Sequence, residues 1–164
     1  MRRAEREAAY VDYVTARRDH LRRVAYALCG DWHRADDLLQ TALVKLYVAW
    51  PRVCRDGRED AYMRQILVRV NIDEHRRPWR REQPVEFVPD VPGASPSGIE
   101  ERTPLVDALL ELPLMQRKTV VLRHWLGMSV QETAFELGIS EGTVKSHTSR
   151  GLAALRLTME ATRN

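Results

Sequence analysis

Near the carboxyl end of the chain, small polar and basic side chains recur in a segment with helical periodicity. Lysine and arginine can bind phosphate oxygens or the O6 and N7 atoms of guanine, and serine and threonine hydroxyls can hydrogen-bond to bases or phosphates. The residues that this chemistry predicts to face DNA are Gly142, Thr143, Lys145, Ser146, Ser149 and Arg150. A helical hairpin that uses the same segment only for packing is the alternative interpretation.

A second basic group lies in the first half of the chain, where four arginines surround Trp79 between residues 75 and 81. Arginines neutralise phosphates and an aromatic ring can stack on a base, so the group suggests a nucleic-acid surface. A solvated basic face is the alternative. Residues four, seven and eleven apart share a helix face, which places Arg64, Val68, Asn71 and His75 in one stripe and Gln65, Arg69, Ile72 and Arg76 in the next.

Metal and catalytic chemistry are not indicated. Cys29, His33, Cys54 and His75 are the candidates for a zinc site, but Gly30 separates the first two and the others are isolated. Cys29, on an apolar helix face, is expected to be a small buried hydrophobe. The chain shows no glycine-rich phosphate loop, Ser/His/Asp set or paired-carboxylate cleft. We therefore expect no catalytic residue, no metal, no cofactor and no enzyme activity.

Two helices and a glycine turn are expected to position the C-terminal basic segment. Ser129-Val130-Gln131-Glu132 predicts a capping box, in which the serine accepts from a first-turn amide and the glutamate reaches back. The helix from Val130 to Leu137 ends at Gly138, which adopts a positive φ at no steric cost. Ser140 then caps a helix from Glu141 to about Thr158.

The spacing of Ala134, Gly138 and Val144 is that of a helix-turn-helix. A small residue allows two helices to cross closely, glycine makes the turn, and an apolar residue anchors the second helix. Further buried contacts are expected from Leu137, Ile139, Leu152 and Leu155. Ahead of this motif, the pattern predicts a helix from Leu105 to Leu112 and another that starts at Pro113 and stops at Gly127.

The N-terminal part reads as three helices with no alternating strand pattern. Apolar periodicity predicts a helix from Tyr10 to Gly30, one from about Ala35 to Trp50 that Pro51 closes, and one from about Ala61 to Arg77 that Pro78 ends or kinks. A turn at Arg55-Asp56-Gly57-Arg58 joins the second and third helices. The fold class expected for the whole chain is all-α.

Composition divides the chain into two small helical domains and a linker. Residues 83–102 carry a net charge of −3, and five of the eight prolines fall in residues 83–104. Residues 1–82 carry +5 and residues 103–164 carry +1. Unstructured loops of about 20 residues are uncommon inside compact domains. We therefore predict domains at 1–82 and 103–164, joined by a flexible, acidic, proline-rich linker.

The location of the protein is expected to be cytoplasmic. The first residues are too charged for a signal peptide, and no run approaches the roughly 20 apolar residues of a membrane span. Two cysteines give no disulfide scaffold.

In order, these features resemble an extracytoplasmic-function (ECF) sigma factor, a group 4 member of the sigma-70 family of bacterial transcription initiation factors. Ala35-Asp36-Asp37-Leu38-Leu39-Gln40 is similar to the polymerase-binding segment of that family, and Tyr62 to Arg77 is similar to its −10-reading helix. Gly127 to Glu132 and Gly142 to Ser146 resemble its −35-reading domain. The resemblance covers nearly the whole chain.

The resemblance implies a role for each of these segments. It implies that Asp37, Leu38, Gln40 and Leu43 bind the clamp of the largest subunits of core RNA polymerase. The −10 contacts it implies are Asp56, Arg64, Arg69, Asn71, Arg76 and Arg77, with Asn71 and the Arg55–Asp60 loop capturing a flipped base. The DNA-facing residues of the C-terminal helix correspond to −35 contacts. The family also implies promoter DNA as a partner and an anti-sigma factor as a regulator, without membrane insertion.

Several positions depart from the family pattern. Thr41 stands where glutamate is usual, Pro78 interrupts a commonly longer basic helix, and His147-Thr148 replaces an arginine and an apolar residue. Thr143 to His147 also resembles the helix-turn-helix of LuxR-type regulators. A transcriptional regulator that is not a polymerase subunit is therefore the alternative, although residues 1–82 lack the β/α alternation of a receiver domain.

Overall fold

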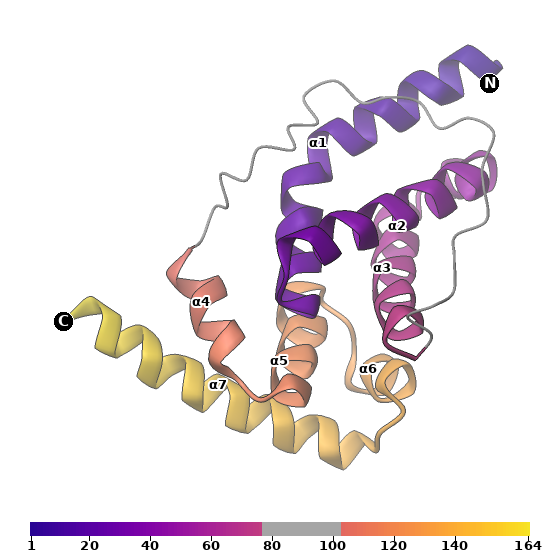
Figure 1. Ribbon diagram of the computed structural model, residues 1–164. Coiled ribbons are helices and arrows are strands. Elements are labelled where there is room, and N and C mark those ends of the chain that lie inside the picture. Colours follow the sequence, from indigo (N-terminus) through magenta and orange to yellow (C-terminus); the bar gives the residue numbers. More distant parts are fainter. Residues whose placement is uncertain (77–102) are drawn as a thin grey trace. The chain divides into compact units, whose positions relative to one another are not determined.

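Helices form all the regular structure in the residues that the computed structural model describes, which are 1–76 and 103–164 (Figure 1). These residues form two compact units. Met1–Ala25 and the chain from Asp31 to the end of α3 make the first, and Tyr26–Gly30 groups with the chain from Thr103 onward. The all-α fold class is confirmed. The predicted linker, Trp79 and Arg77 lie outside the described residues.

Three helices build the first unit: α1 (Arg3–Cys29), α2 (Trp32–Val53) and α3 (Glu59–Arg76). Gly30 has a φ of +78° and ends α1 where the sequence predicts a stop. Asp31 then caps α2 by accepting the N–H of Arg34 at 3.0 Å, and this hydrogen bond lowers the pKa of the Asp31 carboxyl.

α1 begins earlier than its apolar periodicity indicates. Its first turns are charged and exposed, and Arg3 pairs with Glu7 one turn later at 3.2 Å. Such i,i+4 pairs stabilise a helix without burying it, so apolar spacing marks only the buried part of α1.

α2 continues through Pro51, so the prediction that this proline closes the helix is wrong. A proline removes one backbone hydrogen bond, but the next bond spans it, because the N–H of Cys54 donates to the carbonyl of Trp50 at 2.9 Å. Val53 lies beyond the proline and is buried. Packing of this last turn therefore outweighs the local break.

The core of the first unit is apolar and aromatic. Tyr10 and Trp50 meet edge to face with ring centroids 5.6 Å apart, and the Tyr10 hydroxyl donates to the carbonyl of Leu43 at 2.8 Å. Burial raises the pKa of the Tyr10 phenol. Burying a large apolar side chain contributes roughly 1.5–3 kcal/mol, so α2 and α3 are held by residues such as these. The fully buried examples are Leu38, Leu46, Met63, Leu67 and Val68.

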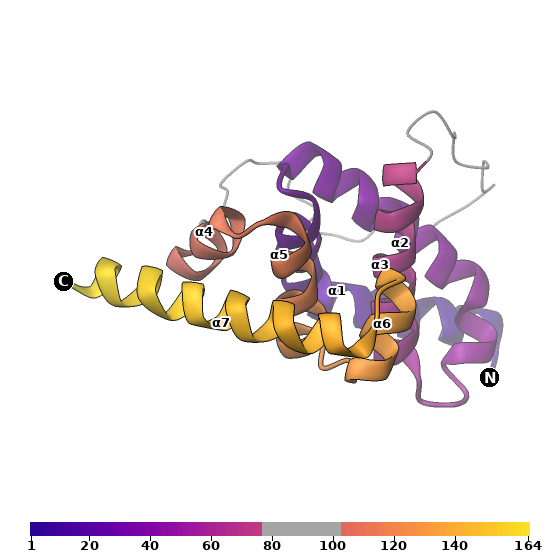
Figure 2. The same ribbon diagram turned by 90° about the horizontal axis from the view of Figure 1, so that it is seen from below.

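The second unit contains α4 (Pro104–Glu111), α5 (Leu114–Val120), a short π-helix (Val121–Trp125), α6 (Val130–Leu137) and α7 (Glu141–Arg163). The sequence predicts one helix from Pro113 to Gly127. The structure instead changes to π geometry at Val121, whose carbonyl accepts the N–H of Leu126 at 2.9 Å. Figure 2 shows α7 as one long helix running beside α4 and α5.

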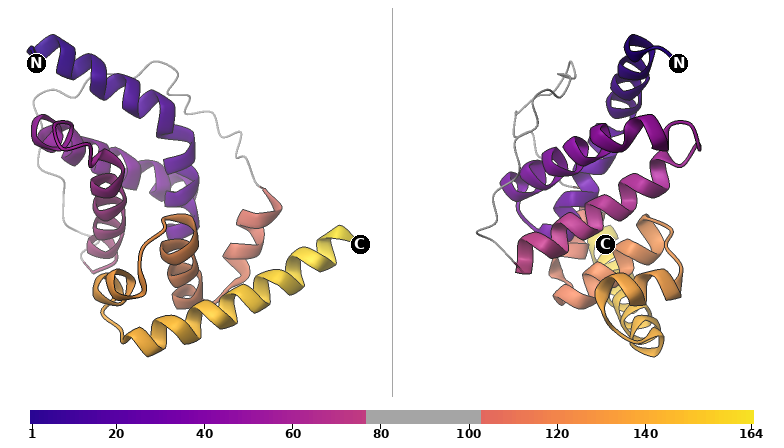
Figure 3. Two further views of the ribbon diagram at one scale, coloured as in Figure 1. Left: turned by 180° about the vertical axis from the view of Figure 1, so that it is seen from behind. Right: turned by 90° about the vertical axis from the view of Figure 1, so that its right-hand side faces the viewer.

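The predicted helix-turn-helix is present in α6, Gly138 and α7 (Figure 3). Both bonds of the capping box form: the N–H of Glu132 donates to Ser129 Oγ at 3.0 Å, and the N–H of Ser129 donates to Glu132 Oε1 at 3.3 Å. Gly138 has a φ of +66°, and Ser140 accepts the N–H of Thr143 at 3.0 Å. α7 extends to Arg163, beyond the expected Thr158.

The apolar contacts of the motif differ in part from expectation. Val144, Ala134 and Leu155 are buried as predicted, and Leu137 and Ile139 are half-buried. Leu152, predicted to be buried, is 37% exposed. It faces away from the side of α7 that carries Val144 and Leu155, because buried positions on this helix recur at 144, 151 and 155.

α7 crosses α5 closely at Gly151. A methyl group built there would stand 2.6 Å from Val120 Cγ2 and 3.5 Å from the carbonyl oxygen of Gln116. Only glycine allows α7 to approach α5 this closely. This crossing lies apart from Ala134, the small residue that the motif spacing marks.

Candidate nucleic-acid interface

The start of α7 presents polar and basic side chains to solvent. Of the six residues predicted to face DNA, Gly142, Lys145, Ser146, Ser149 and Arg150 are exposed and Thr143 is half-buried. The Thr143 hydroxyl lies 2.8 Å from Ser140 Oγ, so it takes part in the helix cap. A helix N-terminus carries partial positive charge, which together with Lys145 and Arg150 favours contact with phosphate.

The opposite side of the same turns packs inward. Val144 is fully buried, and the Thr148 hydroxyl donates to its carbonyl at 2.7 Å. His147 is half-buried, and its Nδ1 atom has no hydrogen-bond partner within residues 103–164 or the rest of the described chain. Both residues of the His147-Thr148 departure thus lie toward the packed side of α7.

The loop between α2 and α3 is a second exposed polar element. Arg55, Asp56, Gly57 and Arg58 are all exposed, and Gly57 has a φ of +64° with open space around it. The predicted turn is confirmed. At its carboxyl end, Asp60 in the first turn of α3 binds two side chains of α1, because Tyr13 donates to Oδ1 at 2.8 Å and Arg17 donates to both carboxylate oxygens.

These contacts change the acidity of the groups involved. The hydrogen bond from Arg17, followed by that from Tyr13, lowers the pKa of the Asp60 carboxyl. Burial, followed by the hydrogen bond to Asp60, raises the pKa of the Tyr13 phenol. Asp60 therefore carries a negative charge that stays paired at neutral pH.

α3 exposes less of its predicted stripes than the spacing implies. Arg69 and Gln65 are exposed and Arg64 is half-buried. Asn71 is only 3% exposed and Val68 is also buried, so the stripe that contains them faces the core. The capture of a flipped base by Asn71 stays a prediction, and its side chain lies on the buried side of α3. Arg76 ends α3, and its side chain lies outside the described set.

The predicted polymerase-binding segment divides between surface and core. Asp37 and Gln40 are exposed on α2, whereas Leu38 and Leu43 are buried. The two leucines therefore pack the helix, and their predicted contact with polymerase stays a prediction. Thr41, which departs from the family pattern, turns its hydroxyl back to the carbonyl of Asp37 at 3.0 Å.

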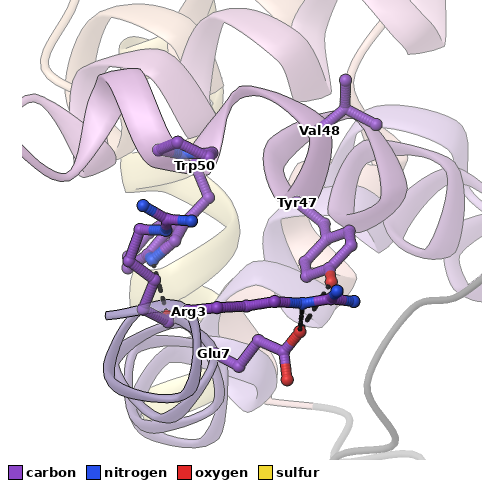
Figure 4. Close-up of a pocket in the computed structure, with 7 residues that line it drawn as sticks. Arg3, Glu7, Tyr47, Val48 and Trp50 are labelled. Atoms are coloured by element: carbon purple, nitrogen blue, oxygen red, sulfur yellow. Dashed lines mark hydrogen bonds and ion pairs between the residues drawn. The ribbon is translucent and has the colours of Figure 1, made fainter. Parts of the chain in front are cut away.

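A hollow that no sequence pattern indicates lies beside the end of α2. It measures about 400 Å³ and is lined by residues of α1 and α2 (Figure 4). Arg3 donates to Glu7 Oε1 at 3.2 Å, the Tyr47 hydroxyl donates to the same oxygen at 3.3 Å, and Trp50 Nε1 donates to the carbonyl of Arg6 at 3.0 Å. Val48 stands beside them and is 66% exposed.

Within residues 1–76 and 103–164, no three His, Cys, Asp or Glu side chains gather as a metal site. Cys29 is half-buried, so its prediction as a buried hydrophobe holds only in part. No described helix is long and apolar enough to cross a membrane.

Two family models match the chain in order along the sequence. Sigma-70 region 2 matches residues 13–81, and sigma-70 region 4 matches residues 102–155. The first match contains α2, the loop and α3, and the second contains the helix-turn-helix.

Curated relatives and a solved structure agree with these models. The RNA polymerase sigma-E factor of Streptomyces avermitilis is 41% identical over 93% of this chain and 86% of that protein. The ECF RNA polymerase sigma factor SigM of Mycobacterium tuberculosis is 33% identical over 85% of this chain and 72% of that protein. The sigma factor RpoE of Bartonella quintana, solved with the anti-sigma factor NepR, has a similar fold, with a TM-score of 0.57 and 20% identity over 91% of this chain and 95% of that one.

Proposed function

The chain belongs to the ECF class of the sigma-70 family, and from this premise we propose which of its surfaces carry out each part of promoter recognition. As a sigma factor it binds core RNA polymerase and directs it to promoters through −35 and −10 elements. It is not an enzyme, since polymerase performs the chemistry. The match to region 2 ahead of region 4 removes the alternative of a LuxR-type regulator.

We propose that the start of α7 reads the −35 element in the major groove. The observation that carries this proposal is the exposed face of α7, which places Lys145, Ser149 and Arg150 beside a helix N-terminus. Side chains at the start of a recognition helix reach base edges, while its N-terminal amides and basic residues bind phosphate. Gly142, Thr143 and Ser146 complete the proposed surface.

The −10 element is assigned to the α2–α3 loop and to α3. Asp56 is exposed at the turn, and Arg69 and Arg64 lie on α3 beyond it. Extruding a base costs a few kcal/mol, which contacts to the flipped base and the binding energy of the holoenzyme offset. Arg76 and Arg77 stay in this proposal as strand contacts from the sequence. Asn71 stays in it as well, as a predicted base contact whose side chain is buried in the described structure.

The polymerase clamp is assigned to the outer face of α2, with Asp37 and Gln40 as direct contacts and Leu38 and Leu43 as the packing beneath them. We expect the protein to act in the cytoplasm, where bacterial polymerase meets the chromosome. An anti-sigma factor and the boundaries 1–82, 83–102 and 103–164 remain predictions.

Size-exclusion chromatography with sigma-free core polymerase tests the α2 assignment. The native chain is expected to co-elute with core enzyme at near-equal stoichiometry, and the double variant Asp37→Ala/Gln40→Ala is expected to lose most of this co-elution. Arg52→Ala, at the exposed far end of α2, is the control. Equal co-elution of the double variant and the native chain would contradict the assignment.

A further inference from the structure

The first arm of the α2–α3 loop is fixed to the core through one carbonyl. Val53 is buried, and its carbonyl oxygen accepts the N–H of Asp56 at 3.3 Å and that of Arg58 at 3.4 Å. The next residue, Cys54, is tied to the carbonyl of Trp50 at 2.9 Å. The chain therefore enters the turn from a backbone that packing holds in place.

The second arm is fixed by α1, more than forty residues earlier in the sequence. Arg17 Nη2 donates to Asp60 Oδ2 at 3.1 Å while its Nε donates to Oδ1, a bidentate geometry that sets both distance and orientation. The Arg17 guanidinium also lies 4.8 Å from the centroid of the Tyr13 ring, and that ring lies 5.5 Å from Trp50. Tyr13 thereby links Asp60 to the aromatic core.

This cluster is poorly placed to stabilise the fold as a whole. The side chains of Arg17 and Asp60 are 41% and 59% exposed, and exposed ion pairs contribute little to stability. The cluster instead joins the first turn of α3, which follows the loop that carries Asp56, to α1. It also engages the carboxylate of Asp60, so that Asp56 is the exposed acid left at the turn.

We propose that Arg17 and Tyr13 are positioning residues for −10 recognition: by holding Asp60, they keep the α2–α3 loop in the shape that receives an extruded base. The inference rests on the proposed function of that loop. A loop held in its binding shape before DNA arrives does not have to lose conformational entropy on binding, and a supporting shell of this kind sharpens recognition.

The molecule supplies a matched control for this proposal. Arg22, also on α1, makes the same kind of bidentate pair with Asp36 on α2, with Nε to Oδ1 at 2.7 Å and Nη2 to Oδ2 at 3.4 Å. Arg17→Gln and Arg22→Gln each remove one α1 arginine, one positive charge and one pair with an aspartate. Only Arg17 is joined to the loop.

The readout is base preference in transcription by reconstituted holoenzyme at saturating core polymerase. A promoter selected with the native chain from a −10 library is varied at one −10 position, with its −35 element held constant. Arg17→Gln is expected to lower the preference for the favoured base about threefold to tenfold, a part of what one base pair ordinarily provides. Tyr13→Phe is expected to have a smaller effect in the same direction, and Arg17→Lys is expected to restore most of the preference.

Equal base preference in Arg17→Gln and Arg22→Gln would overturn the proposal. Thermal unfolding of Arg17→Gln and Arg22→Gln shows whether a difference in base preference merely follows a difference in protein stability. A loss of base preference that scales with the drop in melting temperature in both variants would also overturn the proposal. Asp56→Ala distinguishes failure of the proposed loop function from failure of the positioning inference. If that change leaves −10 preference intact, the proposed function of the loop fails; if it alters preference while Arg17→Gln does not, only the positioning inference fails.

Discussion

The start of α7 and the α2–α3 loop are both exposed and polar, yet different kinds of contact hold them. α7 is set by its sequence neighbours: Ser140 caps it from one residue away and Gly138 turns the chain just before it. The loop depends on Tyr13 and Arg17, which lie 47 and 43 residues from Asp60. The proposed −35 surface is built from local signals and the proposed −10 surface from distant ones, so we expect the two to respond differently to mutation.

The largest effect is expected where α7 crosses α5 at Gly151. Gly151→Leu would force a side chain into Val120 Cγ2, where even a methyl group stands at 2.6 Å. Overpacking of this kind costs about 1–3 kcal/mol of unfolding free energy, and sometimes more. Chemical denaturation checks it, with Gly142→Ala as a control because that position meets only Ser140 Oγ, at 3.9 Å. Similar stability in both variants would contradict the crossing.

Arg150→Ala is expected to weaken −35 binding without unfolding the helix, because Arg150 is exposed. A contact to a base is worth about 1–3 kcal/mol and its loss relaxes specificity at one position. Holoenzyme binding to promoters with varied −35 elements measures this. An equal loss on every sequence would instead identify a phosphate contact, and unchanged binding would remove Arg150 from the surface.

Ser140→Ala tests whether the start of α7 is stabilised by its own N-terminal cap. The hydroxyl accepts the N–H of Thr143 and lies 2.8 Å from its side-chain oxygen. Losing such a cap typically costs about 1 kcal/mol. Ser140→Asp, which can also accept from that amide, is the control and is expected to retain most of the stability. If Ser140→Ala unfolds at the same denaturant concentration as the native chain, local capping does not set this helix.

Asp60→Asn is expected to have the smallest effect on stability, below about 1 kcal/mol, because the Arg17 pair is largely exposed. The Asp60 pKa is lowered from a usual value near 3.9, so the pair stabilises the fold above about pH 4 and this contribution is lost as pH falls through the lowered pKa. The difference in unfolding free energy between the native chain and Asp60→Asn should therefore shrink in acid. Denaturation of both at pH 7 and at pH 3 measures it, and a difference that persists unchanged at pH 3 would exclude the ionised pair as its cause.

The contrast also shows what the sequence could predict. Ser129, Gly138 and Ser140 act on residues within one turn of themselves, so the helix-turn-helix and its exposed polar face follow from spacing. Pro51 misleads because the burial of Val53 overrides a local break. Gly151 has no pattern of its own, since only the position of Val120 on another helix requires a glycine there.

In the first unit, contacts between residues far apart in the sequence decide which side chains are buried and which are paired. Periodicity places Asn71 on a stripe with Arg64, but it does not say which stripe faces the core, and the structure buries Asn71. The partners of Asp60 come from α1, and no spacing rule connects residues 13, 17 and 60. Residues that act through long-range contacts are therefore those that sequence reasoning missed.

Transcription from one promoter, varied separately at its −35 and −10 elements, tests the central claim most directly. Holoenzymes carrying the native chain, Arg150→Ala and Asp56→Ala are compared at saturating core polymerase. The account predicts that Arg150→Ala changes preference only among −35 sequences and that Asp56→Ala changes preference only among −10 sequences. Both variants altering the same element, or neither altering any, would contradict the division of promoter reading between α7 and the α2–α3 loop.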